Sequence, residues 1–237
     1  MVPNEFTIVL TPTRTEHPEN LDCLNSLVKE GFKFLKVPSV HCVDMARAFL
    51  VKTALDNTYS NTDVFLWIDD DIFFDKHHAI SMVDNLRNSP YDLLGAVYPT
   101  RNLNHKGQRQ MVGAFDKSVE NVTFFQPGLY PAITLGFGFT AVKRKVFEVM
   151  NETYGSYPCG LFGQTRIPTY FSHLIEDGVM LTEDYSFCAR ARREGFKIGI
   201  DAEPRLLHMG KYLYGLEDIA QQVPRVESLI VGLDHSN

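Results

Sequence analysis

The 237-residue sequence lacks several features that would place it in other classes of protein. No apolar run approaches the ~18 residues of a membrane-spanning helix, and the first residues lack the basic-then-apolar pattern of a secretory leader. The four cysteines are scattered and form no Cys-x-x-Cys pair, which predicts reduced thiols in a cytoplasmic protein. Positive charge is also scarce, because the net charge of −6 argues against a nucleic-acid-binding surface.

What is present is a globular composition with strand and helix patterns in alternation. Apolar residues make up 44% and charged residues 22%, which suits a chain that buries a core. Strand patterns are predicted at 6–10, 34–37, 64–68 and 92–98, with helical patterns at 20–30, 44–55 and 76–86. This alternation predicts an α/β fold with a doubly wound, mostly parallel sheet.

The second half of the chain is less regular. We predict hairpin-type strands at 110–115 and 122–125, and a glycine-rich segment at 133–140 that leads into a helix at 143–150. Residues 151–181 are predicted to include a long loop, and a helix follows at 182–194. Two strands are predicted at 197–200 and 205–208, and a helix in the tail at 223–231. Gly, Pro and Tyr are frequent in 151–181, which is typical of a loop. The whole sequence, 1–237, is predicted to be one domain.

The most informative stretch is a β-branched and aromatic run, Val64–Ile68, followed by Asp69, Asp70 and Asp71. Three adjacent carboxylates repel one another unless a cation lies among them. In an open α/β sheet, ligands bind at the carboxyl ends of the strands, so a divalent metal is the expected occupant. In an extended segment Asp69 and Asp71 point to the same side and Asp70 to the other. The alternative is a solvated acidic turn.

A second pair of acids, Glu183 and Asp184, follows Thr182 at the start of a predicted helix. Thr182 is a suitable N-cap, and acids in a first helical turn are stabilised by the helix dipole. That stabilisation alone explains the pair. The functional alternative makes one of them a general base that takes a proton from an alcohol.

A single histidine, His208, ends a predicted strand and is followed by Gly210 and Lys211. It is placed to add a nitrogen ligand to a carboxylate-bound metal, and Lys211 offers a cation for phosphate. The alternative is a packed or surface histidine.

The order of these motifs resembles that of the GT-A nucleotide-sugar glycosyltransferases, and in particular the small inverting transferases of the family-2 type. An Asp-x-Asp, a Gly-x-Gly-Phe segment, a Thr-Glu-Asp before a helix and a late His carry the resemblance over 6–211. It implies a GT-A (Rossmann-like) three-layer sandwich with a mostly parallel central sheet. Within the single domain, 1–100 would be the nucleotide-binding half, 101–215 the acceptor-side half and 216–237 a C-terminal tail.

The resemblance also implies an activity. The chain would be a metal-dependent glycosyltransferase that moves a sugar from a nucleotide-diphosphate donor, expected to be a UDP-sugar, to a hydroxyl of a glycan or similar acceptor, with inversion. Mn²⁺ or Mg²⁺ would bridge the diphosphate. By position, Asp71 would be the main metal ligand, Asp69 would contribute directly or through the ribose or a water, and His208 would complete the shell.

Other residues take roles from the same resemblance. The donor-binding set would comprise Thr11, Thr13, Arg14, Asp44, Arg47, Asp69, Asp70 and Lys211. Asp184 would be the base on the acceptor hydroxyl, with Glu183 as its rival, and 136–139 would form a floor near the sugar. Arg47 has a plainer alternative as a solvent-exposed helix arginine. The segment 155–175 would fold over the donor as a lid, or its aromatic side chains would pin it to the core.

Two other classes of function stay open from the sequence. A nucleotidyltransferase that makes nucleotide sugars would carry a glycine-rich, cationic loop after the first strand, whereas 11–14 has one cation and no glycine. A non-catalytic carbohydrate-binding module with a GT-A-like fold would show no turnover. A transferase releases a nucleoside diphosphate and a nucleotidyltransferase produces pyrophosphate, which separates the two enzymes.

Overall fold

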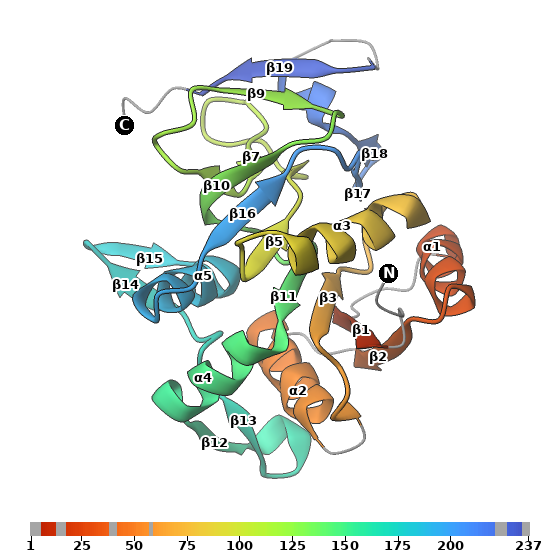
Figure 1. Cartoon of the computed structure of the whole chain (residues 1–237). Helices are drawn as coiled ribbons and strands as arrows, with labels where there is room; N and C mark the ends of the chain where they lie inside the picture. The colour runs from red at the N-terminus through yellow and green to blue at the C-terminus, as the bar shows by residue number, and fades with distance from the viewer. Residues whose placement is uncertain (1–5, 13–17, 38–41, 57–58, 221–226, 234–237) are drawn as a thin grey trace.

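The computed structural model describes residues 6–12, 18–37, 42–56, 59–220 and 227–233. Its helices are α1 (Pro18–Lys29), α2 (Val43–Leu55), α3 (Lys76–Asn88), α4 (Arg144–Tyr154) and α5 (Glu183–Arg193). The central sheet holds β1 (Thr7–Pro12), β2 (Lys33–Val37), β3 (Val64–Ile68), β5 (Leu93–Gly95), β8 (Ala114–Phe115), β10 (Leu129–Thr134), β11 (Phe139–Lys143) and β16 (Ile198–Asp201). Figure 1 shows this sheet through the middle of the molecule.

The central sheet is mixed but mostly parallel. Its strand order is β2-β1-β3-β11-β5-β16-β10-β8. The pairs β1–β2, β1–β3 and β5–β16 are parallel, whereas β11 is antiparallel to β3 and β5, and β10 to β16 and β8. Six strands therefore share one direction, and β10 and β11 oppose them. The α/β class and the parallel pairing of the first strands are confirmed.

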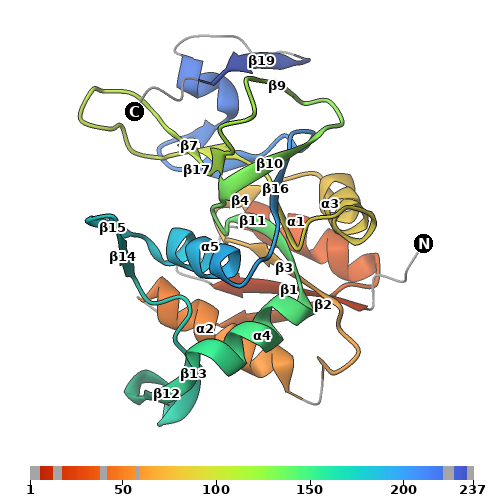
Figure 2. The same ribbon diagram turned by 60° about the vertical axis from the view of Figure 1, so that its left-hand side comes forward.

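Helices pack on both faces of the sheet, with a separate apolar core on each. Side chains alternate along β3, so that Phe65 and Trp67 enter the core with α2, α4 and α5, while Leu66 and Ile68 enter the core with α1 and α3. Figures 1 and 2 show the two groups of helices on opposite sides of β3. Trp67, the only tryptophan, is fully buried, as expected of a core residue.

The prediction of a long loop over 151–181 is wrong. The segment holds two hairpins, β12 (Ser156–Cys159) with β13 (Thr165–Pro168) and β14 (Leu174–Glu176) with β15 (Val179–Leu181). The turn between β14 and β15 is Asp177-Gly178, both at positive φ, which is the geometry of a tight two-residue hairpin. Tyr170 and Phe171 are buried in the core, so these aromatic side chains pin the segment.

The predicted helix at 223–231 is wrong for its last residues, while 223–226 lie outside the described residues. Leu229–Gly232 is a strand, β19, paired antiparallel with β9 (Asn121–Phe124). Leu229 and Val231 pack against the core while Ile230 is 70% exposed, and this period of two is the pattern of a strand on a surface. A short 3₁₀ helix, Leu216–Ala220, precedes it.

Two helix starts differ from prediction. Helix α2 begins at Val43, one residue before the predicted start at 44, because the cap position is Cys42 and Asp44 lies in the first turn. Thr182 does occupy the cap position of α5, but its hydroxyl donates to Asp184 Oδ1 at 2.5 Å instead of capping a backbone N–H. The four cysteines are free. No helix in the described ranges is long and apolar enough to cross a bilayer.

Candidate active site

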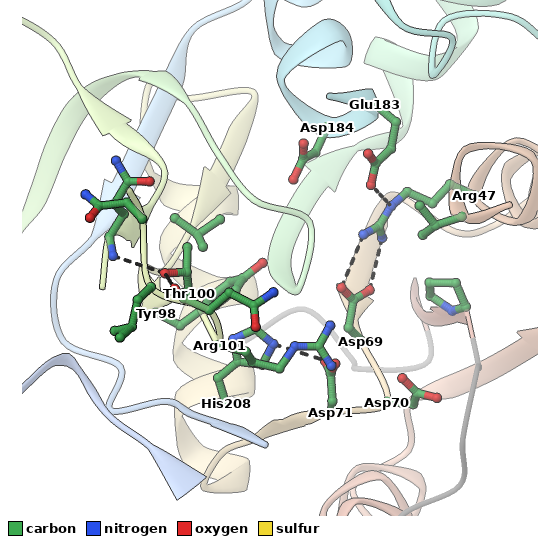
Figure 3. A pocket seen from close by; sticks show the side chains of 17 residues that line it. Arg47, Asp69, Asp70, Asp71, Tyr98, Thr100, Arg101, Glu183, Asp184 and His208 are labelled. Carbon is green, nitrogen blue, oxygen red and sulfur yellow. Dashed lines mark hydrogen bonds and ion pairs between the residues drawn. The ribbon is translucent and has the colours of Figure 1, made fainter. Parts of the chain in front are cut away.

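A polar cavity of about 400 Å³ opens at the carboxyl end of β3. Its walls come from segments far apart in sequence: the acidic turn 69–71, α2, the first turn of α5, and the small strands β6 (Tyr98–Pro99), β7 (Met111–Val112) and β17 (Leu207–Met209). Figure 3 shows the charged side chains converging on it. This is the edge at which open α/β sheets bind ligands.

The acidic triplet is a turn, not the extended segment assumed from the sequence. The Ile72 N–H donates to Asp69 O at 3.2 Å, and the Asp69 N–H donates to Gly138 O at 3.0 Å. The Asn20 side chain donates to the carbonyls of Ile72 at 2.7 Å and Asp69 at 3.4 Å. Backbone and amide groups therefore fix where the three carboxylates point.

Arg47 on α2 holds two of the acids together. Its guanidinium donates to both oxygens of Asp69, at 3.1 and 3.2 Å, and its Nε lies 3.7 Å from Glu183 Oε1. Arg47 is only 2% exposed, so the alternative of a solvent-exposed helix arginine is wrong. Burial raises the pKa of Asp69 to about 6, although Arg47 opposes this shift. Arg47 itself keeps a raised pKa despite burial, because Asp69, Glu183 and Asp184 stabilise its charge.

Asp71 meets His208 on the other side of the turn. The pairing of β17 with β4 (Ile72–Phe73) sets His208 opposite Ile72, and the Met209 N–H donates to Asp71 O at 2.8 Å. His208 Nε2 lies 3.6 Å from Asp71 Oδ2, and the same oxygen is 2.8 Å from the Arg101 guanidinium. Figure 3 shows Asp71 directed toward Arg101 and His208 while Asp69 is directed toward Arg47.

The tautomer of His208 suits a metal ligand. Its Nδ1 lies 2.8 Å from Pro99 O, and a carbonyl only accepts, so in the neutral ring Nδ1 carries the hydrogen. Nε2 then presents a lone pair toward Asp71. No group of three or more His, Cys, Asp or Glu side chains has metal-site spacing within the described residues. Two protein ligands, Asp71 and His208, still suit Mg²⁺ or Mn²⁺, because phosphate and water oxygens can complete the coordination shell of these ions.

Glu183 and Asp184 begin α5 at the opposite wall of the cavity. Glu183 is engaged with Arg47, whereas Asp184 makes no ion pair within the part of the chain that the structure describes. Its Oδ1 accepts from the Thr182 hydroxyl at 2.5 Å and the Tyr185 N–H at 2.9 Å. Burial, and then the charge of Glu183, raise the pKa of Asp184. A carboxylate of raised pKa at a cavity wall is a stronger base than an ordinary aspartate.

The glycine-rich segment 136–138 packs against Tyr98, which lines the cavity, and does not line the cavity itself. A Cβ added at Gly136 would lie 2.3 Å from Val112 Cγ1 and 2.6 Å from the Tyr98 hydroxyl, and one at Gly138 would lie 2.5 Å from that hydroxyl. The Gly138 N–H donates to this hydroxyl at 3.0 Å. Only glycine lets the backbone approach the ring this closely.

Replacing Tyr98→Phe is expected to lower the free energy of unfolding by about 1–3 kcal/mol, since the buried Gly138 N–H loses its acceptor. Urea unfolding followed by circular dichroism measures the change. The matched control is Tyr157→Phe, on an exposed ring, where a change within about 0.5 kcal/mol is expected. Equal stabilities of the two variants would contradict the role given to the Tyr98 hydroxyl.

The remaining donor-binding residues predicted from the sequence are placed unevenly. Asp70 lines the cavity with its neighbours. Thr11 is buried at the end of β1, and its hydroxyl has no hydrogen-bond partner within the described residues. Asp44 lines a different cavity, beside β12 and β13, so the structure does not bring it to this site. Lys211 lines an adjoining cavity. Thr13 and Arg14 lie outside the described residues.

Sequence reasoning missed Asn20, Tyr98 and Arg101. Asn20 had no local signal, because its partners lie 49 and 52 residues away. Tyr98 ends a predicted strand, and the sequence does not show that its ring packs against Gly136 and Gly138. Arg101 comes shortly after the predicted strand 92–98, at the same edge of the sheet as the acidic turn. That position after a strand was the sequence signal for a role in the site.

Fold and site together define an α/β protein with a carboxylate-rich cavity at the end of its central strands. No protein-family model matches the chain, and no curated protein matches its sequence. Among solved structures, the chain is similar to A197 from STIV, with a TM-score of 0.54 and 14% identity over 93% of this chain and 97% of that one. This likeness shows a shared fold.

A weaker likeness joins the chain to GalNAc-T7, a structure solved with UDP, GalNAc and Mn²⁺. The TM-score is 0.47 and the identity 11%, over 86% of this chain and 43% of that one, so the chain spans less than half of that protein.

Proposed function

We propose that this protein is a GT-A-type glycosyltransferase that moves a sugar from a nucleotide-diphosphate donor, a UDP-sugar, to a hydroxyl of a glycan or similar acceptor, with inversion. One observation carries the proposal: Asp71 and His208, the two side chains suited to bind a metal, line the same cavity as Asp184 and lie across it from Asp184. The order of motifs in the sequence supports the same conclusion.

In the proposed reaction, Asp184 is the base. Its Oδ1 is held by Thr182 and Tyr185, so Oδ2 is the atom that takes the proton from the acceptor hydroxyl. The hydroxyl oxygen attacks the anomeric carbon in line with the leaving diphosphate, which inverts the configuration. Glu183 is less suited as the base, because Arg47 already stabilises its charge.

Other residues position the donor. Arg47 holds Asp69 beside the carboxyl end of β1, where Pro12 also lines the cavity. A ribose would lie there. Asp71 and His208 would hold Mn²⁺ or Mg²⁺, which when bound neutralises charge on the leaving diphosphate. Tyr98, held from behind by Gly138, bounds the space left for the sugar.

The test is calorimetric titration of nucleoside diphosphates and nucleotide sugars, first with Mn²⁺ and then with EDTA. We expect micromolar-range binding of one base type that is lost with EDTA. Asp71→Asn is expected to weaken metal-dependent binding by about tenfold or more, because one of two protein ligands is lost. Asp75→Asn, at the exposed start of α3, is the control and should bind as the wild type does.

Turnover then separates the enzyme classes. Release of a nucleoside diphosphate supports the transferase, and pyrophosphate from a nucleoside triphosphate supports a nucleotidyltransferase. Binding of sugars with no nucleotide binding under either condition would contradict the proposal and favour a carbohydrate-binding module.

A further inference from the structure

A second cavity adjoins the candidate active site and is lined by cations. We call it the basic cavity; it measures about 440 Å³ and is lined by Arg101, Asn102, Leu103, Arg109, Gly210, Lys211 and Tyr214. Its described lining includes no carboxylate. Three of these residues, 101–103, also line the active-site cavity, so the two spaces meet at the loop after β6.

Two of the three cations differ in how firmly they are held. Arg109 has its guanidinium 3.5 Å above the Tyr214 ring and donates to Thr100 O at 3.0 Å and to Arg101 O. The Arg101 side chain is 43% exposed and turns the other way, into the active site. An exposed side chain that makes one ion pair with the described part of the chain exchanges partners at low cost.

Arg101 is paired with the carboxylate oxygen of Asp71 that a metal ion would need as a ligand. Its Nη1 lies 2.8 Å from Asp71 Oδ2, which is also the oxygen that faces His208 Nε2 at 3.6 Å. A guanidinium and a divalent cation at one carboxylate oxygen repel each other. Metal binding at Asp71 and His208 therefore requires Arg101 to leave.

A diphosphate offers Arg101 a better partner than one carboxylate. It carries more than one negative charge, and its oxygens match the forked donors of a guanidinium. In the basic cavity it would also meet Lys211 and Arg109. Each such contact lowers the cost of releasing Asp71.

We propose that Arg101 is an exchangeable cation that couples the binding of a diphosphate group to the binding of a divalent metal. Without an anion, Arg101 holds Asp71. A diphosphate entering the basic cavity draws Arg101 away and opens the Asp71–His208 pair. By linkage, the metal tightens diphosphate binding by the same factor. The proposal rests on the proposed function for the identity of the metal and the diphosphate.

The direct test measures Mn²⁺ binding to the full chain without nucleotide, from the electron paramagnetic resonance signal of the free ion. We expect Arg101→Gln to bind Mn²⁺ about tenfold or more tightly than the wild type, and Arg101→Lys to fall between them. Adding Asp71→Asn to Arg101→Gln should abolish the gain, which shows that the metal uses this carboxylate.

The matched control is Lys106→Gln, which removes one exposed positive charge from the same loop. It lines neither cavity, so its Mn²⁺ affinity should equal that of the wild type. An equal gain in Lys106→Gln would reduce the effect to net charge and overturn the proposal.

Inorganic pyrophosphate, titrated in EDTA, tests the basic cavity itself. We expect Lys211→Gln to weaken pyrophosphate binding several-fold and Lys106→Gln to leave it unchanged.

The two proposals fail in different ways. Equal Mn²⁺ affinities of the wild type and Arg101→Gln, with Mn²⁺-dependent UDP binding intact, would remove the role of Arg101 and leave the proposed function standing. No metal-dependent UDP binding in any variant would remove both.

Discussion

Asp184→Asn is expected to lower the rate of sugar transfer by about 10²- to 10⁴-fold while donor binding stays unchanged. The amide has nearly the shape of the carboxylate and can keep the hydrogen bond from the Tyr185 N–H, but it cannot take the acceptor proton. The measurement is the turnover number with a saturating donor, together with the dissociation constant of the nucleoside diphosphate.

The control is Asp177→Asn, at the exposed tip of the β14–β15 hairpin, which should transfer sugar as the wild type does. Glu183→Gln is the discriminating variant, because a larger loss of activity there than in Asp184→Asn would assign the base to Glu183.

The pH dependence of activity gives a second test of the base. Because the pKa of Asp184 is raised, wild-type activity should fall with decreasing pH at a higher pH than an ordinary aspartate would give. Asp184→Asn should lack this limb.

Arg47→Ala is expected to lower the free energy of unfolding by about 2–4 kcal/mol, because it leaves two partly buried carboxylates without their cation. Among the described residues, Arg47 is the cation paired with Asp69; it also lies against Glu183, and its guanidinium lies 5.5 Å from the centre of the Trp67 ring. Urea unfolding followed by the fluorescence of Trp67 measures the loss, and this signal comes from one site because the chain has a single tryptophan.

Lys52→Ala is the matched control on the same helix. Lys52 is exposed and pairs with Asp56 at 2.7 Å, and exposed pairs of this kind contribute at most about 1 kcal/mol. The deficit of Arg47→Ala should shrink as the pH falls. Without Arg47 the folded-state pKa of Asp69 rises above its already raised value of about 6, so the penalty is present above that pKa and is relieved when Asp69 is protonated. A deficit that does not change with pH would contradict the account.

Most of the fold could be predicted from local sequence patterns. The run Val64–Ile68 was predicted with the bounds that β3 has, because a short apolar run bounded by polar residues is a local signal. The antiparallel insertion of β11 between β3 and β5 was not predicted. It depends on pairing between Phe139 and Ile68, which lie far apart along the chain, and periodicity carries no information on such partners.

The site was predicted by residue type more than by geometry. The acids at 69–71 and 183–184 and His208 line one cavity, and their proximity could not be deduced from spacing alone. The burial of Arg47 could not be predicted from the sequence either, because its partner Asp69 is 22 residues away and Glu183 is still farther. Until those partners are known, an arginine in an amphipathic helix has no feature that distinguishes it from a surface residue.

The packing of Tyr98 against Gly136 and Gly138 also constrains how the sequence can drift. A methyl group at Gly138 would collide with the Tyr98 ring and hydroxyl, and one at Gly136 would collide with Val112 as well as with that hydroxyl. These neighbours must become smaller before a side chain can be added, or at the same time. In related sequences, a side chain at 138 should therefore occur with a smaller residue at 98, and a side chain at 136 with smaller residues at both 98 and 112.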